Sequence, residues 1–345
     1  MDNAPLLELK GINIGYETPT GTVFAANDIN LSLYPRDALG IVGESGSGKS
    51  TLAMGVLSLL PSNARMSGEA LFAGTNLVGL SDAELKSFRW KKISVVFQRA
   101  MNSLSPVYTI GEQVHDIYKV HMPNATRKEA DEVITAFLNV VNLTDRVLSL
   151  YQHQLSGGML QRICIALSLI FHPQIVIFDE ATTALDVVTQ GQVIGEIKRL
   201  QKNMNVSSIV ITHDISVVAE LCNRIAVMYA GYIVESGLTE EVLTRPVHPY
   251  TDGLVASFPS VETSKTMVRG IPGTLPNLKE KPQGCVFAPR CRLVQDICRL
   301  QQPVTEEITP GHFVTCHAHL GRNSATPSDT DDLGDDGGSE GGLNV

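Results

Sequence analysis

The stretch GESGSGKS, residues Gly43 to Ser50, lies between the short apolar run Leu39–Val42 and an apolar stretch that begins at Thr51. It fits the pattern G-x-x-x-x-G-K-[ST], in which a glycine-rich turn presents backbone N–H groups to phosphate oxygens. The run before it predicts a buried strand and the stretch after it predicts a helix, which is the setting that this pattern requires. We therefore predict a phosphate-binding loop (P-loop) and regard a chance glycine-rich turn as the weaker alternative.

The residues of this loop have distinct expected tasks in holding a nucleotide. We expect Lys49 to reach the terminal phosphates and the Ser50 hydroxyl to ligate Mg²⁺. The other residues predicted to line the nucleotide are Gly43, Ser45, Gly46, Gly48 and Thr51.

A second apolar run, Ile175–Phe178, ends in two acids, Asp179 and Glu180. A buried strand excludes unpaired carboxylates, so their position at its C-terminal end indicates a site. We expect Asp179 to hold Mg²⁺, directly or through water, and Glu180 to polarise the attacking water. A solvated strand end is the alternative, and the P-loop disfavours it.

Short β-rich runs alternate with amphipathic stretches along the chain. The runs are Leu39–Val42, Ile93–Phe97, Ile175–Phe178, Ser208–Ile211 and Ile225–Met228. Buried runs of this kind are typical of an α/β core with largely parallel strands. Leu6–Ile14 and Thr22–Leu33 also read as extended segments, and we expect them to form an antiparallel sheet added to that core.

The sequence pattern changes at two places after the P-loop, first to helical spacing and later to a proline-rich composition. Residues 99–160 are predicted to form a helical insertion, in which Thr126 and Glu129 fit a capping box before a helix. After about Thr244 the chain is rich in proline and contains four of its six cysteines. We therefore predict a main α/β domain over residues 1–244, a small cysteine-containing C-terminal domain over 245–320 and an acidic tail over 321–345.

The formal charge of −9 is concentrated in the tail. From residue 321 onward six acids face one arginine, which gives a net −5 there and leaves the rest of the chain mildly acidic. A nucleic-acid binder needs a basic face to displace counterions from phosphates, so this balance argues against nucleic acid as a partner. The tail is rich in Gly, Ser and Asp and poor in large apolar residues, which predicts disorder.

The sequence shows no segment of the kind that enters a membrane. The opening residues, MDNAPLLELK, carry an acid where a secretory signal would carry positive charge. The longest apolar stretch, residues 163–171, is well short of the ~20 residues that span a bilayer. Any membrane part is therefore expected from another chain.

A second glycine-containing turn, Leu155-Ser156-Gly157-Gly158-Met159, opens an apolar helical stretch. Together with the P-loop and the strand acids, it resembles the signature sequence of the ATP-binding cassette (ABC) ATPases, LSGGQ, in the variant LSGGM. The resemblance implies a P-loop NTPase fold with a RecA-like core, an antiparallel β subdomain and a helical subdomain. It also implies ATP and Mg²⁺ as ligands.

Four further residues match motif positions of that family, in the expected order along the chain. Tyr16 stands where an adenine-stacking aromatic is expected, with a plain strand residue as the alternative. Gln98 matches the glutamine loop, which also contacts Mg²⁺. Asp186 matches the dimer-contacting D-loop, and His213 matches the switch histidine. By this resemblance the catalytic residues are Glu180, His213 and Gln98.

In this family two cassettes pack head to tail, so that each ATP lies between one chain's P-loop and the partner's signature turn. The resemblance therefore implies that Ser156, Gly157 and Gly158 hold the γ-phosphate of an ATP bound mainly by a second subunit. One chain then carries two half-sites, ATP closes the dimer, and hydrolysis opens it.

Three segments narrow the resemblance to the ATPase subunits of dipeptide, oligopeptide and nickel importers: residues 98–111, His248-Pro249-Tyr250-Thr251 and Ile271-Pro272-Gly273. The narrower resemblance implies a peripheral ATPase at the cytoplasmic face of the membrane. The implied partners are a homologous, non-identical ATPase subunit, two transmembrane permeases and an extracytoplasmic substrate-binding protein. Peptides, nickel and oligosaccharides stay open as cargo. Arg99 and Ala100 depart from the acid and proline usual in those relatives, at the expected permease contact.

Two other functions are weaker alternatives. An ABC ATPase of DNA repair or translation would carry long coiled coils, zinc modules or two cassettes, whereas this chain has one set of motifs. A non-hydrolysing regulatory subunit would lack Glu180 or His213, and both are present.

The proline-rich segment contains four cysteines, Cys285, Cys291, Cys298 and Cys316. Disulfides are disfavoured in a cytosolic chain, and the spacing lacks the C-x₂-C knuckle common in zinc sites. Four thiolates can hold a [4Fe–4S] cluster, with which relatives of this pattern are associated, so we predict a cluster with a structural or redox-sensing role. Zinc and unliganded thiols are the alternatives. The other two cysteines, Cys164 and Cys222, are expected in the core.

Overall fold

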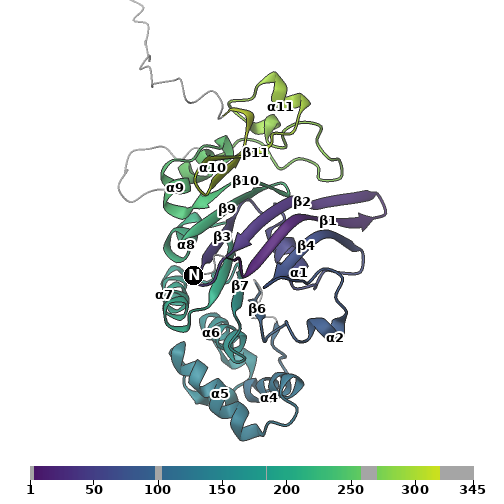
Figure 1. The fold of residues 1–345 in the computed structure, drawn as a ribbon. Helices are drawn as coiled ribbons and strands as arrows, with labels where there is room; N and C mark the ends of the chain where they lie inside the picture. The colour runs from purple at the N-terminus through teal and green to yellow at the C-terminus, as the bar shows by residue number, and fades with distance from the viewer. Residues whose placement is uncertain (1–3, 98–102, 184, 258–269, 319–345) are drawn as a thin grey trace, which may run out of the picture.

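A computed structural model describes residues 4–97, 103–183, 185–257 and 270–318. Its main sheet has the strand order β11-β12-β10-β9-β3-β8-β7-β6 (Figure 1). The parallel strands of this sheet are β3 (Ala38–Val42), β6 (Ile93–Val96), β7 (Ile175–Asp179), β8 (Ser207–Thr212) and β9 (Arg224–Tyr229). Each coincides with one of the predicted β-rich runs, which confirms the α/β core.

An antiparallel sheet lies beside this core. Its strand order is β2-β1-β4-β5. The bounds are β1 (Leu7–Thr18), β2 (Gly21–Leu33), β4 (Ala64–Phe72) and β5 (Thr75–Asn76). The predicted antiparallel sheet beside the core is therefore confirmed. Its strands β1 and β2 are both longer than the apolar patterns alone indicated.

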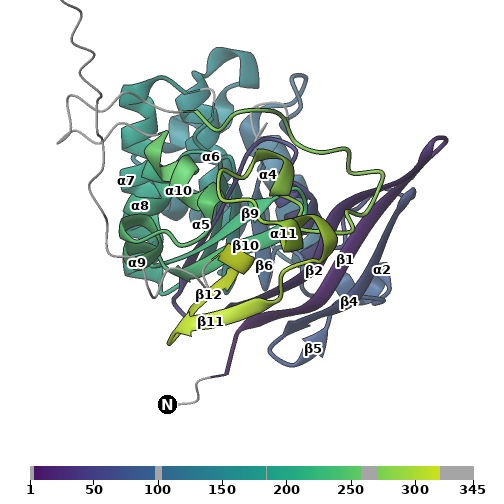
Figure 2. The same ribbon diagram turned by 90° about the horizontal axis from the view of Figure 1, so that it is seen from above.

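Successive residues of the parallel strands face opposite layers, because side chains alternate along a strand. On β7, Val176 and Phe178 join a core with the helices on one face, while Ile175 and Ile177 join a core with the antiparallel sheet on the other. The helices of the first face are α6 (Gly157–Leu169), α7 (Val187–Met204) and α8 (Ile215–Leu221) (Figure 2). Helix α1 (Lys49–Val56) lies on the second face. Burial on both faces explains why these runs are continuously apolar.

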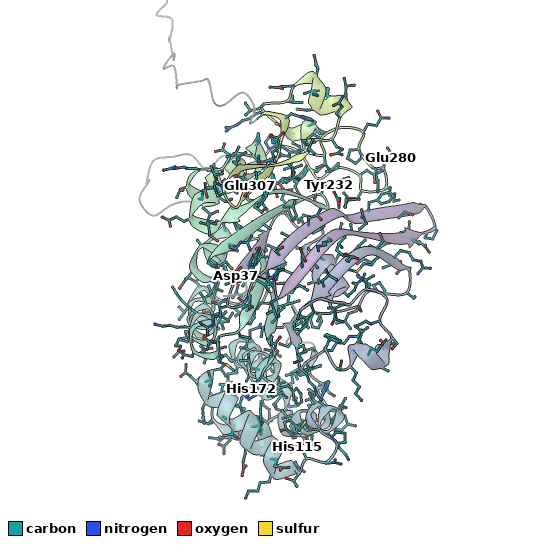
Figure 3. The ribbon with its side chains drawn as sticks, in the orientation of Figure 1. Asp37, His115, His172, Tyr232, Glu280 and Glu307 are labelled. Carbon is teal, nitrogen blue, oxygen red and sulfur yellow. The ribbon has the colours of Figure 1, made fainter. Side chains whose placement is uncertain are left out.

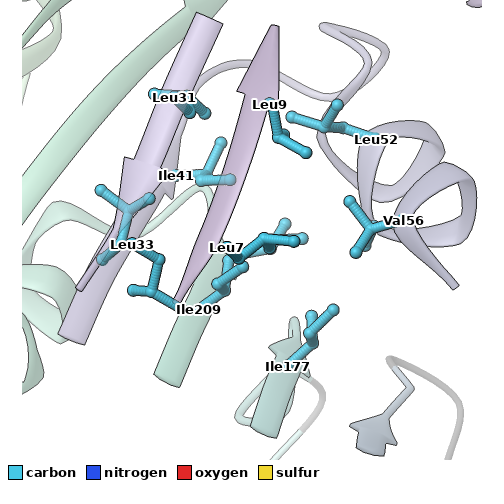
Figure 4. A pocket seen from close by; sticks show the side chains of 12 residues that line it. Leu7, Leu9, Leu31, Leu33, Ile41, Leu52, Val56, Ile177 and Ile209 are labelled. Carbon is cyan, nitrogen blue, oxygen red and sulfur yellow. The ribbon is translucent and has the colours of Figure 1, made fainter. Parts of the chain in front are cut away.

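The layer between the two sheets encloses a small apolar cavity of about 20 Å³. Leucine and isoleucine side chains from both sheets and from α1 surround it, among them Leu7, Ile41, Leu52 and Ile209 (Figure 4). A nucleotide needs polar partners and far more room, so this space is a packing gap of the core and not a ligand site.

A helical region forms one end of the molecule, where His115 lies, while Glu307 lies towards the other end (Figure 3). Its elements are α4 (Ile110–His121), α5 (Arg127–Val140), η1 (Asp145–Ser149) and η2 (Gln152–Gln154), and the short α2 (Asp82–Leu85) precedes them. Thr126 and Glu129 form the predicted capping box at the start of α5, and Thr109 and Glu112 form another at the start of α4. These caps satisfy N–H groups that a helix start leaves unpaired.

The C-terminal segment packs onto the main sheet. Its elements are β10 (Tyr232–Leu238), α9 (Thr239–Thr244), α10 (Pro249–Ala256), η3 (Ala288–Arg290), α11 (Asp296–Leu300), β11 (Thr305–Thr309) and β12 (His312–Thr315). β12 pairs with β10, so the last hairpin extends the main sheet, and Phe287 packs in the same core as Tyr229. The predicted domain division near Thr244 stays a prediction, since the sheet and core run across it.

A buried polar network fastens this hairpin. His312 is 1% exposed, and its Nε2 lies 2.9 Å from Glu235 Oε1 while its Nδ1 lies 3.4 Å from Glu241 Oε1. Glu235 also accepts the backbone N–H groups of Val247 and His248, each at 2.9 Å. Burial alone would lower the pKa of His312, but the two carboxylates outweigh it and raise that pKa above its ordinary 6.5.

We predict that this network makes stability fall as the pH rises. Because the folded pKa of His312 exceeds the unfolded value, its stabilisation is complete below about pH 6.5 and is lost as pH rises through the folded pKa. The difference in Tm between wild type and His312→Gln should therefore be largest below pH 6.5 and shrink above it. The partly exposed His317 provides the control: a shift in His317→Gln with the same pH dependence would contradict this account.

Candidate functional site

The P-loop passes between backbone carbonyls of two different sheets. A Cβ on Gly43 would lie 2.0 Å from the carbonyl oxygen of Met228, and a Cβ on Gly48 would lie 2.0 Å from that of Ala25. Gly48, the N-cap of α1, also has a φ of +102°. Only glycine fits these two positions, because any side chain would overlap backbone atoms that cannot move independently.

Lys49 points back into the loop that it follows. Its Nζ donates to the carbonyl oxygens of Gly43 at 2.7 Å and Glu44 at 2.8 Å, and it lies 3.4 Å from Ser47 Oγ. Burial lowers the pKa of Lys49, although Glu180, Asp179 and Glu44 act in the opposite direction. The ammonium group is thus partly desolvated and held where a phosphate would compete for it.

Two of the three predicted Mg²⁺ ligands, Ser50 and Asp179, lie together. Ser50 Oγ donates to Asp179 Oδ1 at 2.8 Å, which joins the start of α1 to the end of β7. Burial raises the pKa of Asp179, against the lowering effect of the Ser50 hydrogen bond. A hydroxyl beside a desolvated carboxylate suits a small hard cation, so these two residues fit Mg²⁺.

Glu180, predicted to polarise the attacking water, lies beside His213, the predicted switch histidine. His213 Nδ1 lies 3.3 Å from Glu180 Oε1, and Thr183 Oγ1 donates to Glu180 Oε2 at 2.9 Å. Glu180 has a φ of +48°, a conformation that non-glycine residues rarely adopt. Strained backbone of this kind concentrates at functional sites, where it aims a side chain that regular structure would direct elsewhere.

Tyr16 lies at the edge of the loop. Its hydroxyl is 3.1 Å from Thr51 Oγ1, which ties β1 to the first turn of α1. The structure therefore places two predicted nucleotide-lining residues in contact, and adenine stacking by Tyr16 stays a prediction.

The signature turn forms the start of α6, next to the start of α7. Ser156 is the N-cap of α6, and its side chain accepts the N–H of Met159. Asp186 is the N-cap of α7, and it accepts the N–H and the hydroxyl of Thr189. A Cβ on Gly158 would lie 2.4 Å from Thr189 Cγ2, so the starts of the two helices pack closely.

Some predicted residues lie outside the described ones. They are Gln98, Arg99 and Ala100 in the glutamine loop, Ala184 as the first residue of the D-loop match Ala184-Leu185-Asp186, and the acidic tail from residue 321. Sequence reasoning assigned no site role to Tyr250 and Arg290, which both contact the P-loop residue Glu44. Tyr250 belonged to a recognised block, but nothing in the sequence pointed from it to the loop.

Comparisons with known proteins agree with this arrangement. The profile of the family described as ABC transporter matches residues 26–183, and that of the oligopeptide/dipeptide transporter C-terminal region matches residues 234–298. The oligopeptide transport ATP-binding protein OppD of Escherichia coli (strain K12) is 41% identical over 313 residues, covering 90% of this chain and 92% of that protein. This chain belongs to the ABC transporter ATP-binding proteins. Members of that family hydrolyse ATP, which confirms the predicted enzyme class.

Other similarities support the same family. A probable peptide ABC transporter ATP-binding protein of Sinorhizobium fredii is 40% identical, covering 90% of this chain and 94% of that protein. Among solved structures, the dimeric bacterial ABC transporter cassette MJ0796 is 28% identical with a TM-score of 0.61, covering 68% of this chain and 98% of that one. Within the described residues of this ABC ATPase, no helix is long and apolar enough to cross a membrane.

The predicted iron–sulfur cluster is not supported. Cys285 lies within electrostatic range of Cys298 and Cys316, but the described residues contain no group of three or more metal-binding side chains placed to hold one ion. Burial raises the pKa of Cys285 to about 11 and also raises that of Cys291. Iron and sulfide in equal amounts in anaerobically purified protein would establish the cluster.

Contact between Gly158 and Thr189 can be tested by paired substitutions. We expect Gly158→Ala to destabilise the protein by about 1–3 kcal/mol, because the added methyl group overlaps Thr189 Cγ2. Thr189→Ser removes that methyl but keeps the hydroxyl that donates to Asp186. Urea unfolding should show that Gly158→Ala/Thr189→Ser regains most of the loss. An unrescued double variant would mean that the contact is not what limits residue 158.

Proposed function

We propose that this chain is the ATPase subunit of an ABC importer that powers uptake of peptides through separate transmembrane permeases. The observation that carries the proposal is the 41% identity to OppD over 92% of that protein, whose name describes oligopeptide transport. The match of residues 234–298 to a region described for oligopeptide and dipeptide transporters supports the same cargo class. The alternatives in DNA repair and translation find no support in these matches.

Binding of MgATP is assigned to the P-loop and the end of β7. Lys49 would exchange its bonds to the Gly43 and Glu44 carbonyls for phosphate oxygens, and its buried charge strengthens that contact. Ser50 and Asp179, already 2.8 Å apart, would hold Mg²⁺, which when bound neutralises charge on the phosphates. The glutamine-loop role of Gln98 is carried over as part of this proposal.

Water activation is assigned to Glu180 and His213. Glu180 is only 11% exposed in its side chain and points at His213, which is 56% exposed and can reach a ligand at the surface. We propose that Glu180 accepts the proton of the attacking water while His213 holds its orientation. Both groups lie on loops that follow neighbouring parallel strands, β7 and β8, which is where α/β sheets place their ligands.

Complete sites are proposed to require a second cassette. The α6 N-terminus can bind an anion through the free N–H groups of Gly157 and Gly158, and Ser156 beside them is exposed. Next to this turn, Val187 and Val188 are 86% and 71% exposed, which is unusual for two consecutive apolar residues unless another surface covers them. A head-to-tail dimer with a homologous, non-identical subunit would cover this surface and bring the turn to the partner's ATP.

The remaining partners follow from the importer assignment. We propose two permeases, an extracytoplasmic substrate-binding protein and a position at the cytoplasmic face of the membrane. Reconstitution of the assembled transporter in vesicles tests the cargo. ATP-dependent uptake of a peptide is expected, and uptake of nickel or an oligosaccharide with no uptake of peptides would contradict the proposal.

Glu180→Gln tests the catalytic assignment. The substitution keeps the size of the side chain but removes the base, so turnover should fall by ~10²–10⁴ while ATP affinity is retained. Lys49→Ala should instead weaken ATP binding itself. Near-normal hydrolysis by Glu180→Gln in the assembled transporter would contradict the role of Glu180.

Mixing subunits tests the shared site. Ser156→Arg should leave ATP binding by this isolated chain unchanged, because its own P-loop is intact, and should lower hydrolysis at the site whose P-loop belongs to the partner. Steady-state rates of assemblies that combine mutant and wild-type subunits would separate the two sites. Loss confined to this chain's own P-loop would exclude the head-to-tail arrangement.

A further inference from the structure

The outer edge of the P-loop is held by the C-terminal segment. The backbone N–H of Glu44 donates to Tyr250 Oη at 3.0 Å, and Arg290 Nη1 donates to Glu44 Oε2 at 2.9 Å. Tyr250 lies on α10 and Arg290 at the end of η3, so both partners come from the C-terminal segment, outside the strands of the sheet that carries the loop. The backbone and the side chain of Glu44 are thus fixed at the same time.

Arg290 is nearly buried at this position and makes several hydrogen bonds there. Its side chain is 6% exposed, and it also donates to the carbonyl oxygens of Pro272 at 2.7 Å and Ile271 at 3.2 Å. Tyr229 Oη accepts from it at 3.3 Å, and its guanidinium lies 5.6 Å from the centre of that ring. A rigid fork of donors can serve four acceptors at once, which a lysine ammonium group at this place could not do.

Glu44 connects these contacts to the phosphate-binding groups. Its carbonyl oxygen accepts from Lys49 Nζ at 2.8 Å and from the N–H of Ser47 at 3.1 Å. A shift of Glu44 therefore moves an acceptor of the lysine and the turn that presents the loop's N–H groups. Leu275 of the C-terminal segment also lies against the loop: its Cδ1 is 3.5 Å from the position that a Cβ on Gly46 would take. The segment therefore contacts the loop at Gly46 as well as at Glu44.

We propose that Tyr250 and Arg290 form a loop brace, a pair of positioning residues that fix the P-loop in its phosphate-binding conformation. The C-terminal segment thereby sets the affinity for ATP without touching the nucleotide. This inference rests on nucleotide binding at the P-loop, as proposed above, and adds that the binding is coupled to a segment near Cys285 and Cys291. A flexible loop would have to be ordered by each ATP, at a cost that the brace removes in advance.

A double-mutant cycle on nucleotide affinity tests the brace. Arg290→Gln and Glu44→Gln should each weaken binding of a fluorescent ATP analogue by about tenfold, the effect expected for one charge-assisted hydrogen bond. Arg290→Gln/Glu44→Gln should be no weaker than the worse single variant, because both remove the same contact. Arg292→Gln is the matched control, since Arg292 pairs with Asp252 in the same segment, and it should bind as wild type.

Additive effects of the two substitutions, or equal binding by Arg290→Gln and Arg292→Gln, would overturn the proposal. If Arg290→Gln does not fold, Arg290→Lys and Tyr250→Phe carry the test, with Tm measured without nucleotide to separate affinity from stability. Unchanged affinity in both would also overturn it. Lys49→Ala distinguishes the underlying function: normal binding by that variant would contradict nucleotide binding at the P-loop, whereas normal binding by Arg290→Gln would contradict only the brace.

Discussion

The close backbone approach at Gly43 and Gly48 is the constraint on which the rest of the structure depends. Each glycine lets the P-loop pass where a Cβ would lie 2.0 Å from a carbonyl oxygen, one on β9 and one on β2. The contacts continue as backbone hydrogen bonds, from Gly231 N–H to Ser47 O and from Asn27 N–H to Gly231 O. The loop is therefore the joint between the two sheets, and its shape is set by both before any phosphate binds.

Much of this architecture could be predicted because its signals are local. The parallel strands are buried on both faces, so each appears as a continuous apolar run, and Thr126 with Glu129 marks the start of α5 through a contact three residues apart. The placement of Ser50 beside Asp179 was also predictable, because motifs at the carboxyl ends of parallel strands meet at one edge of the sheet.

The C-terminal segment could not be predicted in the same way. β11 and β12 are only five and four residues long and carry no apolar run, so the pairing of β11 with β12 and of β12 with β10 left no pattern in the sequence. The ion pair between Arg290 and Glu44 joins positions 246 residues apart, a separation across which neither periodicity nor spacing gives information. The spacing of the cysteines is a weak guide to a metal site for a related reason: the distance between residues along the chain does not fix whether their sulfur atoms converge.

The P-loop and the signature turn differ in how their polar groups are satisfied. Glu44, Lys49 and Ser50 have partners within the chain, drawn from the loop itself, from β7 and from the C-terminal segment. The signature turn is different. The Ser156 side chain accepts the N–H of Met159, but the geometry of a helix start leaves the N–H groups of Gly157 and Gly158 without intrahelical acceptors. In the proposed head-to-tail arrangement, a γ-phosphate held by another subunit would supply the anion that these N–H groups can bind. ATP binding would then depend on the C-terminal segment at one end of the nucleotide and on the partner cassette at the other.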